Sequence, residues 1–131
     1  MKMINKHNII FLAIIIFFFS CNNDYHEEKE LLLCSNISKC WNLLEEGSIK
    51  YIPKGRHYCF YKNNKFLVFY YDKQNNKIEY DYGDQAFTNE WIFKNDSILV
   101  MSGFDNKIIK LTKDSLIIIN PEKILMKLIP G

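Results

Sequence analysis

Short apolar runs alternate with polar and turn residues through most of the chain. Between residues 57 and 128 these runs recur roughly every 8 to 12 residues, a spacing typical of an antiparallel sandwich or barrel. They are rich in Ile, Tyr, Phe and Val, which suit the half-buried surface of a sheet. The predicted strands are residues 57–62, 65–71, 77–82, 90–94, 97–101, 107–112, 115–120 and 122–128. The pattern therefore predicts an all-β antiparallel meander of about eight strands.

The stretch before residue 57 permits two interpretations. Four apolar residues recur there at helical spacing: Leu33, Ile37, Trp41 and Leu44. Residues 41–44 fit a first strand equally well, because apolar positions spaced for a helix also occur in buried strands. We expect a strand from about Cys40, preceded by a short helix or an irregular segment. Residues 49–52 are expected to add a further short strand.

The N-terminus has a different pattern. Its first residues carry Lys2 and Lys6 and no acid, and residues 9–19 form an unbroken apolar run that ends at Ser20. A positive start, a short apolar stretch and a small residue are the parts of a secretory signal. A helix of the apolar run would be about 16 Å long, too short for a bilayer core of about 30 Å. We therefore predict an export signal over residues 1–20 rather than a membrane-spanning anchor.

The end of this signal, Phe18-Phe19-Ser20-Cys21, resembles the lipobox of bacterial lipoproteins. The resemblance implies that the signal is cut before Cys21 and that this residue carries the lipid, including acyl chains such as palmitate. Each buried CH2 group contributes about 0.8 kcal/mol to membrane attachment. Asn22 follows, whereas Asp at this place favours the inner membrane in such proteins. The implied location is the cell envelope, anchored to the outer membrane on its periplasmic or surface face.

A polar stretch separates the anchor from the rest of the chain. Residues 22–30 contain four acids: Asp24, Glu27, Glu28 and Glu30. The stretch resembles the acidic tether of some surface lipoproteins, and a solvated linker fits it equally. We expect a signal over residues 1–20, a polar tether with a short helix or irregular segment over 21–37, and one domain over 38–131.

The domain resembles small lipocalin-like domains across about residues 38–128. The segments that carry the resemblance are Trp41-Asn42-Leu43, residues 55–60, Asn64-Lys65-Phe66, Trp91-Ile92-Phe93, residues 95–99, Ile109-Lys110-Leu111-Thr112 and Asp114-Ser115-Leu116-Ile117. Lys39 stands where such domains usually have Gly. The resemblance implies a meander barrel on a lipid-anchored envelope protein, usually without enzymatic activity.

Composition and charge fit a globular protein and argue against nucleic acid as a partner. Hydrophobic residues make up 48% of the chain and aromatic residues 15%. The chain has 17 Lys and Arg against 15 Asp and Glu, and two of those lysines, Lys2 and Lys6, belong to the signal. The rest of the chain is therefore neutral, whereas nucleic-acid binding requires a basic surface.

Three cysteines remain besides Cys21: Cys34, Cys40 and Cys59. The envelope outside the inner membrane is oxidising, so a disulfide can form there. If Trp41 and Phe60 face the core, strand alternation places Cys40 and Cys59 together on the other face. We favour a Cys40–Cys59 bridge, with Cys34–Cys40 as the rival pairing and three buried thiols as the alternative.

Few residues suggest catalysis or a bound metal. His57 and Cys59 lie two apart on one strand face, but a cysteine nucleophile also needs an orienting third group. Glu79, Asp81 and Asp84 lack the liganding series of a calcium loop and are interpreted as a solvated strand face. We expect no catalytic residue, no metal and no cofactor.

Ten aromatic residues leave two interpretations of the barrel interior. They are Tyr51, Tyr58, Phe60, Tyr61, Phe66, Phe69, Tyr70, Tyr71, Trp91 and Phe93. Side chains of this kind fill a small barrel, and they can also line a cavity for an apolar ligand. We expect a lipid-anchored, non-enzymatic protein that binds a small apolar ligand or an envelope partner. The alternative is a protein-interaction module, such as an inhibitor of a periplasmic or surface enzyme, and an enzyme is third.

Overall fold

The computed structural model describes residues 26–50, 55–79 and 89–131, which form a helix and a single antiparallel sheet. The helix covers residues 26–34. The strands are β1 (Ser38–Glu46), β2 (Ile49–Lys50), β3 (His57–Tyr61), β4 (Phe66–Tyr71), β5 (Lys77–Glu79), β6 (Trp91–Asn95), β7 (Ile98–Met101), β8 (Phe104–Leu111), β9 (Leu116–Ile119) and β10 (Leu125–Pro130).

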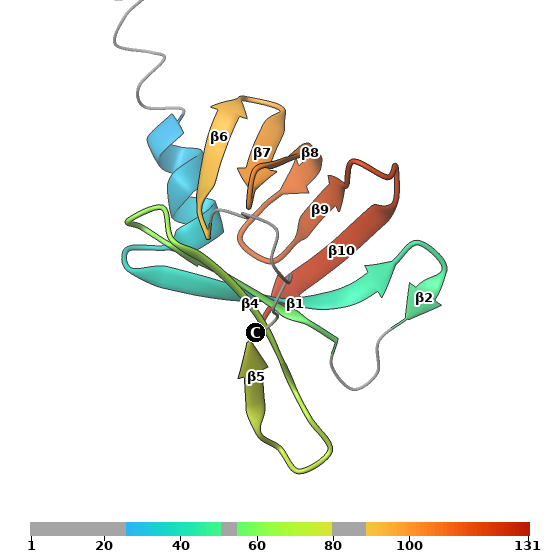
Figure 1. Cartoon of the computed structure of the whole chain (residues 1–131). Helices are drawn as coiled ribbons and strands as arrows, with labels where there is room; N and C mark the ends of the chain where they lie inside the picture. Colours follow the sequence, from blue (N-terminus) through green and yellow to red (C-terminus); the bar gives the residue numbers. More distant parts are fainter. Residues whose placement is uncertain (1–25, 51–54, 80–88) are drawn as a thin grey trace, which may run out of the picture.

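The sheet is a meander that curls into a half-barrel. Its strand order is β5-β4-β3-β1-β10-β9-β8-β7-β6, and β2 pairs with the end of β1. β1 and β10 pair in the middle of this order, and β5 and β6 are the two edge strands (Figure 1). A bridge between Lys65 and Glu90 and a hydrogen bond from Phe66 N to Asn89 O (2.8 Å) connect β4 to the start of β6. The predicted all-β meander is confirmed.

Alternate residues of the strands point into the hollow of the half-barrel and form its core. Strand alternation places residues i and i+2 on one face, as for Trp41 and Leu43 on β1 or Leu116 and Ile118 on β9. The buried core cluster consists of Leu33, Cys34, Trp41, Leu43, Tyr58, Phe60, Phe66, Val68, Trp91, Phe93, Leu99, Met101, Leu116, Ile118, Met126 and Leu128. The two tryptophans, Trp41 and Trp91, are both buried in this core, at 0% and 1% exposed.

Several strand boundaries differ from the predicted ones because the turns between the strands lie at other residues than the sequence pattern indicated. β8 begins at Phe104, three residues before the predicted start, since a two-residue turn joins it directly to β7. β10 begins only at Leu125, because residues 120–124 form a turn. In that turn Asn120 Oδ1 accepts a hydrogen bond from Ile124 N (3.0 Å) and Lys123 has a φ of 63°. The predicted strand over residues 77–82 extends beyond the part of the chain that the structure describes.

The segment expected to begin as a polar tether is helical from residue 26 and docks on the sheet. Leu33 and Cys34 at the end of the helix belong to the buried core, whereas Ile37 is 79% exposed. Of the apolar residues that recur at helical spacing, Leu33 therefore belongs to the helix, Trp41 and Leu44 belong to β1, and Ile37 lies in the bend between them. The core thus includes residues before residue 38, which the sequence pattern had placed outside the domain.

The helix lies over one end of the half-barrel, beside β6 (Figure 1). From the helix, Lys29 Nζ donates to Asp96 O in the β6–β7 turn. Lys39 Nζ on β1 donates both to Leu32 O in the helix (3.2 Å) and to Lys113 O (2.8 Å) in the β8–β9 turn. Because turns of a meander alternate between the two ends of a sheet, the β7–β8 and β9–β10 turns lie at the other end. Among the described residues, no helix combines the length and apolar character needed to cross a bilayer.

Candidate functional site

A pocket of about 420 Å³ opens at the end of the half-barrel away from the helix. This volume falls within the range of about 300 to 1,000 Å³ that is typical of small-molecule sites. Its lining is more apolar than polar and comes from residues in or next to β1, β3, β4, β7, β8 and β10 and from two turns. The lining residues are Glu46, Arg56, Tyr58, Phe66, Met101, Ser102, Phe104, Asn106, Asn120, Pro121, Glu122 and Met126.

The β7–β8 turn places a buried hydroxyl at this pocket. Ser102 and Gly103 have φ values of 50° and 82°, the pair of positive values that a tight two-residue hairpin requires. Ser102 N donates to Glu90 O (2.9 Å), which fixes the turn against the residue directly before β6. The side chain is 5% exposed, and its Oγ has no hydrogen-bond partner in the part of the chain that the structure describes. Ser102 is thus the lining residue with an unsatisfied polar atom.

Two asparagines hold the turns that surround the pocket. Asn106 is 3% exposed, and its Nδ2 donates to Leu99 O (3.3 Å) and Phe104 O (3.0 Å). Asn120 Oδ1 accepts from Ile124 N and shapes the β9–β10 turn. Both asparagines thus bond to backbone atoms of the turns, and these bonds hold the turns in place as parts of the pocket wall.

An ion pair lies at the mouth of the pocket. Arg56, the only arginine of the chain, donates from its guanidinium to the carboxylate of Glu46, and both side chains are about a quarter exposed. The guanidinium also lies 6.0 Å from the ring centroid of Tyr58, within reach of a cation–π interaction. The positive charge at this pocket is therefore already balanced by a neighbouring carboxylate.

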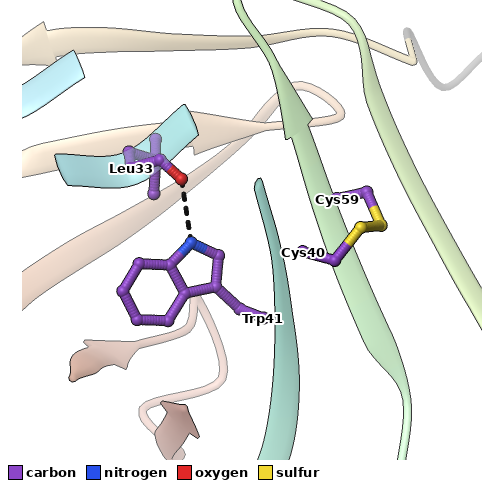
Figure 2. The surroundings of a disulfide bond; sticks show 4 residues. All are labelled: Leu33, Cys40, Trp41 and Cys59. Carbon is purple, nitrogen blue, oxygen red and sulfur yellow. Dashed lines mark hydrogen bonds between the residues drawn. A yellow bond between two sulfur atoms is a disulfide. The ribbon is translucent and has the colours of Figure 1, made fainter. Parts of the chain in front are cut away.

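The structure contains the disulfide that was favoured from the sequence (Figure 2). Cys40 on β1 is paired directly with Cys59 on β3, their Cα atoms are 4.0 Å apart, and their sulfur atoms are bonded. On the other face of β1, Trp41 points into the core, where its Nε1 donates to Leu33 O (2.9 Å). Strand alternation thus placed the tryptophan and the disulfide on opposite faces, as expected.

The face that carries this disulfide is partly buried. Cys59 is 1% exposed, and the His57 ring beside it stacks on Phe69 with ring centroids 4.8 Å apart. Tyr71 contacts both of these rings edge-on. Side chains on β3 and β4 therefore cover part of the face opposite the core.

The remaining described thiol, Cys34, is buried at the end of the helix. Burial raises the pKa of the Cys34 thiol, and the nearby charge of Glu30 raises the pKa further. Its Sγ donates to Glu30 O (3.1 Å), the carbonyl one helical turn earlier. This environment favours a neutral thiol that packs like a small apolar residue.

The sequence-based alternatives for chemistry gain no support from the described residues. The Cys59 sulfur is bonded to Cys40, so it has no proton that His57 could remove to form a nucleophilic thiolate. Glu79 lies on the short edge strand β5, while Asp81 and Asp84 fall outside the described residues. Within residues 26–50, 55–79 and 89–131, no three His, Cys, Asp or Glu side chains are grouped to hold a metal ion.

The aromatic residues take several places in the fold. Phe60, Trp91 and Phe93 are core residues, whereas Tyr58 and Phe66 belong to the core and also line the pocket. Tyr70 and Tyr71 are exposed. Tyr51, like Cys21, lies outside the part that the structure describes. Aromatic side chains thus fill much of the interior, and the binding of an apolar ligand by those at the pocket stays a prediction.

Sequence reasoning missed most of the polar residues at the pocket. Ser102 lies in a Ser-Gly pair between two predicted strands, a signal that indicates a hairpin turn without indicating burial. Arg56 was notable only as the single arginine of the chain.

Comparison with known proteins gives no indication of function, so we infer the function from the pocket. No protein-family model, no curated protein and no solved structure matches this chain.

Proposed function

We propose that the protein is a lipid-anchored, non-enzymatic binding protein of the bacterial cell envelope that holds a small apolar ligand in the pocket of its half-barrel. The pocket carries this proposal. Its apolar lining includes Tyr58, Phe66, Met101 and Met126, and it lies at the end of the sheet that the helix leaves open. Apolar pockets with a few well-placed polar groups are typical of small-molecule sites.

The sequence of the N-terminus supports the anchor and the location. The apolar run ending at Ser20-Cys21 has the features of a lipoprotein signal. Lipidation of Cys21, with palmitate among its acyl chains, would hold the domain at the membrane surface. Asn22 fits the outer membrane. The Cys40–Cys59 disulfide is consistent with an oxidising compartment.

Photo-crosslinking tests the binding role with the full chain in its own membranes. An uncharged alkyl probe that carries a diazirine is added to envelopes, illuminated, and located on the protein by peptide mass spectrometry. We expect cross-links on pocket-lining residues such as Tyr58 and Phe66. Met126→Trp should fill the pocket and reduce these cross-links, because Met126 lines it.

The matched control is Leu125→Trp, which adds the same ring at the neighbouring position. Leu125 is 37% exposed and points to the opposite face of β10. This variant should keep the pocket cross-links. Cross-links scattered over exposed residues, and unaffected by Met126→Trp, would refute the binding role.

A second candidate function is a protein-interaction module, such as an inhibitor of a periplasmic or surface enzyme. The observation in its favour is the set of isoleucines on the sheet that face solvent. Ile92, Ile109 and Ile129 are 58%, 50% and 40% exposed. If this candidate is right, Ile92→Lys weakens binding to the partner while Met126→Trp leaves it unchanged.

A further inference from the structure

The hydroxyl of Ser102 is the unsatisfied polar group at the pocket. Its Oγ is buried and has no hydrogen-bond partner among the described residues, although Ser102 lines the pocket. A buried donor without a partner is unfavourable, and such groups in native proteins usually have an explanation. A serine hydroxyl reaches a new partner by rotation about one bond. A ligand in the pocket can therefore supply the partner that the protein lacks.

The charges around the pocket restrict the kind of ligand group that fits there. Among the described residues of the lining, two carry carboxylates, Glu46 and Glu122, and one is a cation, Arg56. Arg56 is already engaged by Glu46, so these described residues together hold a small excess of negative charge. An anionic head group would meet repulsion from the acids and would have to compete for Arg56. An uncharged head group meets neither obstacle.

The apolar lining defines the rest of the ligand. Tyr58 and Phe66 form one wall with ring centroids 6.1 Å apart, and Met126 adds a flexible side chain that adapts to irregular shapes. A chain or ring of carbon atoms can lie against these side chains. The combination of an apolar wall and one buried hydroxyl matches a molecule with an apolar body and a single polar end.

We infer that the ligand is an uncharged amphipathic molecule, with its apolar body against Tyr58, Phe66 and Met126 and a hydroxyl, carbonyl or amide head group hydrogen-bonded to Ser102 Oγ. This inference rests on the proposed ligand-binding function and specifies the ligand class for the same pocket. The hydrogen bond positions the head group, and the acids of the lining select against carboxylates.

Competition against the alkyl diazirine probe tests this inference in the same envelopes. Decanol, decanoate and decyl chloride have alkyl chains of equal length and differ in the head group. In the wild-type protein, decanol should displace the probe at lower concentration than decanoate. Ser102→Gly removes the hydroxyl at a position where the φ of 50° suits glycine. This variant should require about threefold to tenfold more decanol, the effect of one hydrogen bond.

Two comparisons separate this effect from a general change in the protein. Ser35→Gly is the matched control, because Ser35 also has a positive φ (58°), is exposed and lies outside this pocket. It should leave competition by decanol unchanged. Decyl chloride, which is a poor hydrogen-bonding partner, should compete equally with the wild-type protein and the Ser102→Gly variant. Ser102→Ala serves as a second variant that keeps Cβ, in case the glycine loosens the turn.

The outcomes distinguish failure of the inference from failure of the proposed function. Probe cross-links in the pocket, with equal competition by decanol in the wild-type and both Ser102 variants, would overturn the role of Ser102 and leave the binding function standing. Decanoate competing as well as decanol would overturn the preference for an uncharged head group. Absence of any pocket cross-link in the wild-type protein would overturn both proposals.

Discussion

Each tryptophan side chain is held both by packing and by a hydrogen bond. Trp41 Nε1 donates to Leu33 O (2.9 Å), and Trp91 Nε1 donates to Tyr61 O (2.8 Å). The Trp91 ring also meets the rings of Phe60 and Phe93 edge-on, with centroid distances of 6.1 and 5.7 Å. Aromatic pairs of this geometry stabilise a core beyond the area that they bury. The sheet is therefore sensitive to the loss of either indole.

Replacing Trp91 with alanine should lower the free energy of unfolding by about 3 to 5 kcal/mol, because it leaves a cavity in the core. A domain of this size has only about 5 to 15 kcal/mol of stability in total. Equilibrium unfolding in urea, followed by circular dichroism, measures the change. Ile92→Ala is the control, since Ile92 is next in sequence but 58% exposed, and it should change stability little. Equal stability of the Trp91 variant and the wild type would contradict this prediction.

At the scale of elements, the helix over residues 26–34 is part of the folded core rather than a spacer. Leu33 belongs to the buried core cluster, and its carbonyl accepts the Trp41 hydrogen bond. The acids that suggested a tether, Glu27, Glu28 and Glu30, lie on exposed positions of the same helix. One amphipathic element thus combines a polar outer surface with an apolar contact to the sheet.

Two leucines on this helix provide a matched test of docking. Leu33→Ala should lower the free energy of unfolding by about 2 to 5 kcal/mol, the usual range for a buried leucine. Leu31→Ala makes the same chemical change at a side chain that is 50% exposed, and it should have a much smaller effect. Urea unfolding of both variants gives the comparison. Similar values for the two would show that the helix does not pack on the sheet.

The Cys40–Cys59 disulfide joins two elements, β1 and β3, that are already hydrogen-bonded neighbours. Its main effect is on the unfolded chain, where it closes a loop across a sequence separation of 19 residues. Closing a loop of this size contributes about 3 kcal/mol in the chain-entropy model. The central part of the sheet therefore depends on oxidising conditions for part of its stability.

Reduction should lower the denaturant midpoint of the wild-type protein by an amount that corresponds to about 2 to 4 kcal/mol. The variant with both Cys40→Ala and Cys59→Ala should start at that lower midpoint and show no response to reductant. Urea unfolding with and without dithiothreitol measures both. The bridge would be ruled out if the reductant left the denaturant midpoint of the wild-type protein unchanged and peptide mapping found all three thiols free.

At the scale of the whole molecule, the two ends of the half-barrel differ in character. The helix lies beside β6 at one end (Figure 1), where Lys29 bonds to the β6–β7 turn and Lys39 of β1 joins the helix to the β8–β9 turn. The β7–β8 and β9–β10 turns line the pocket at the other end. The proposed anchor at Cys21 precedes the helix by only a few residues. Attachment at that point would hold the helix end near the membrane, since a residue spans at most about 3.6 Å.

Changing Cys21 to Ser should abolish incorporation of labelled palmitate and release the protein from the membrane fraction. The thiol is the group to which the lipid would be attached, and a serine hydroxyl is not an equivalent acceptor for that step. Radiolabelling and membrane fractionation measure the two effects, and Cys34→Ser is the control that keeps Cys21. Mass spectrometry of the wild-type protein that finds residues 1–20 still attached would contradict the anchor.

The alternation of side chains along each run was enough to predict the strands, their inward faces and the placement of Cys40 opposite Cys59. These features depend on local periodicity, which the sequence records directly. The signal pattern before Cys21 is local in the same way and remains a prediction.

Only the tertiary structure decided that residues 26–34 dock on the sheet, that β5 and β6 are its ends, and that a pocket forms. These features depend on where distant segments meet. Periodicity indicates on which face of its strand or helix a residue lies, but it does not indicate which distant residue that side chain contacts. Ser102 illustrates the difference. Its Ser-Gly pair predicts a turn, but its hydroxyl is buried only because other strands and turns, distant in sequence, surround it.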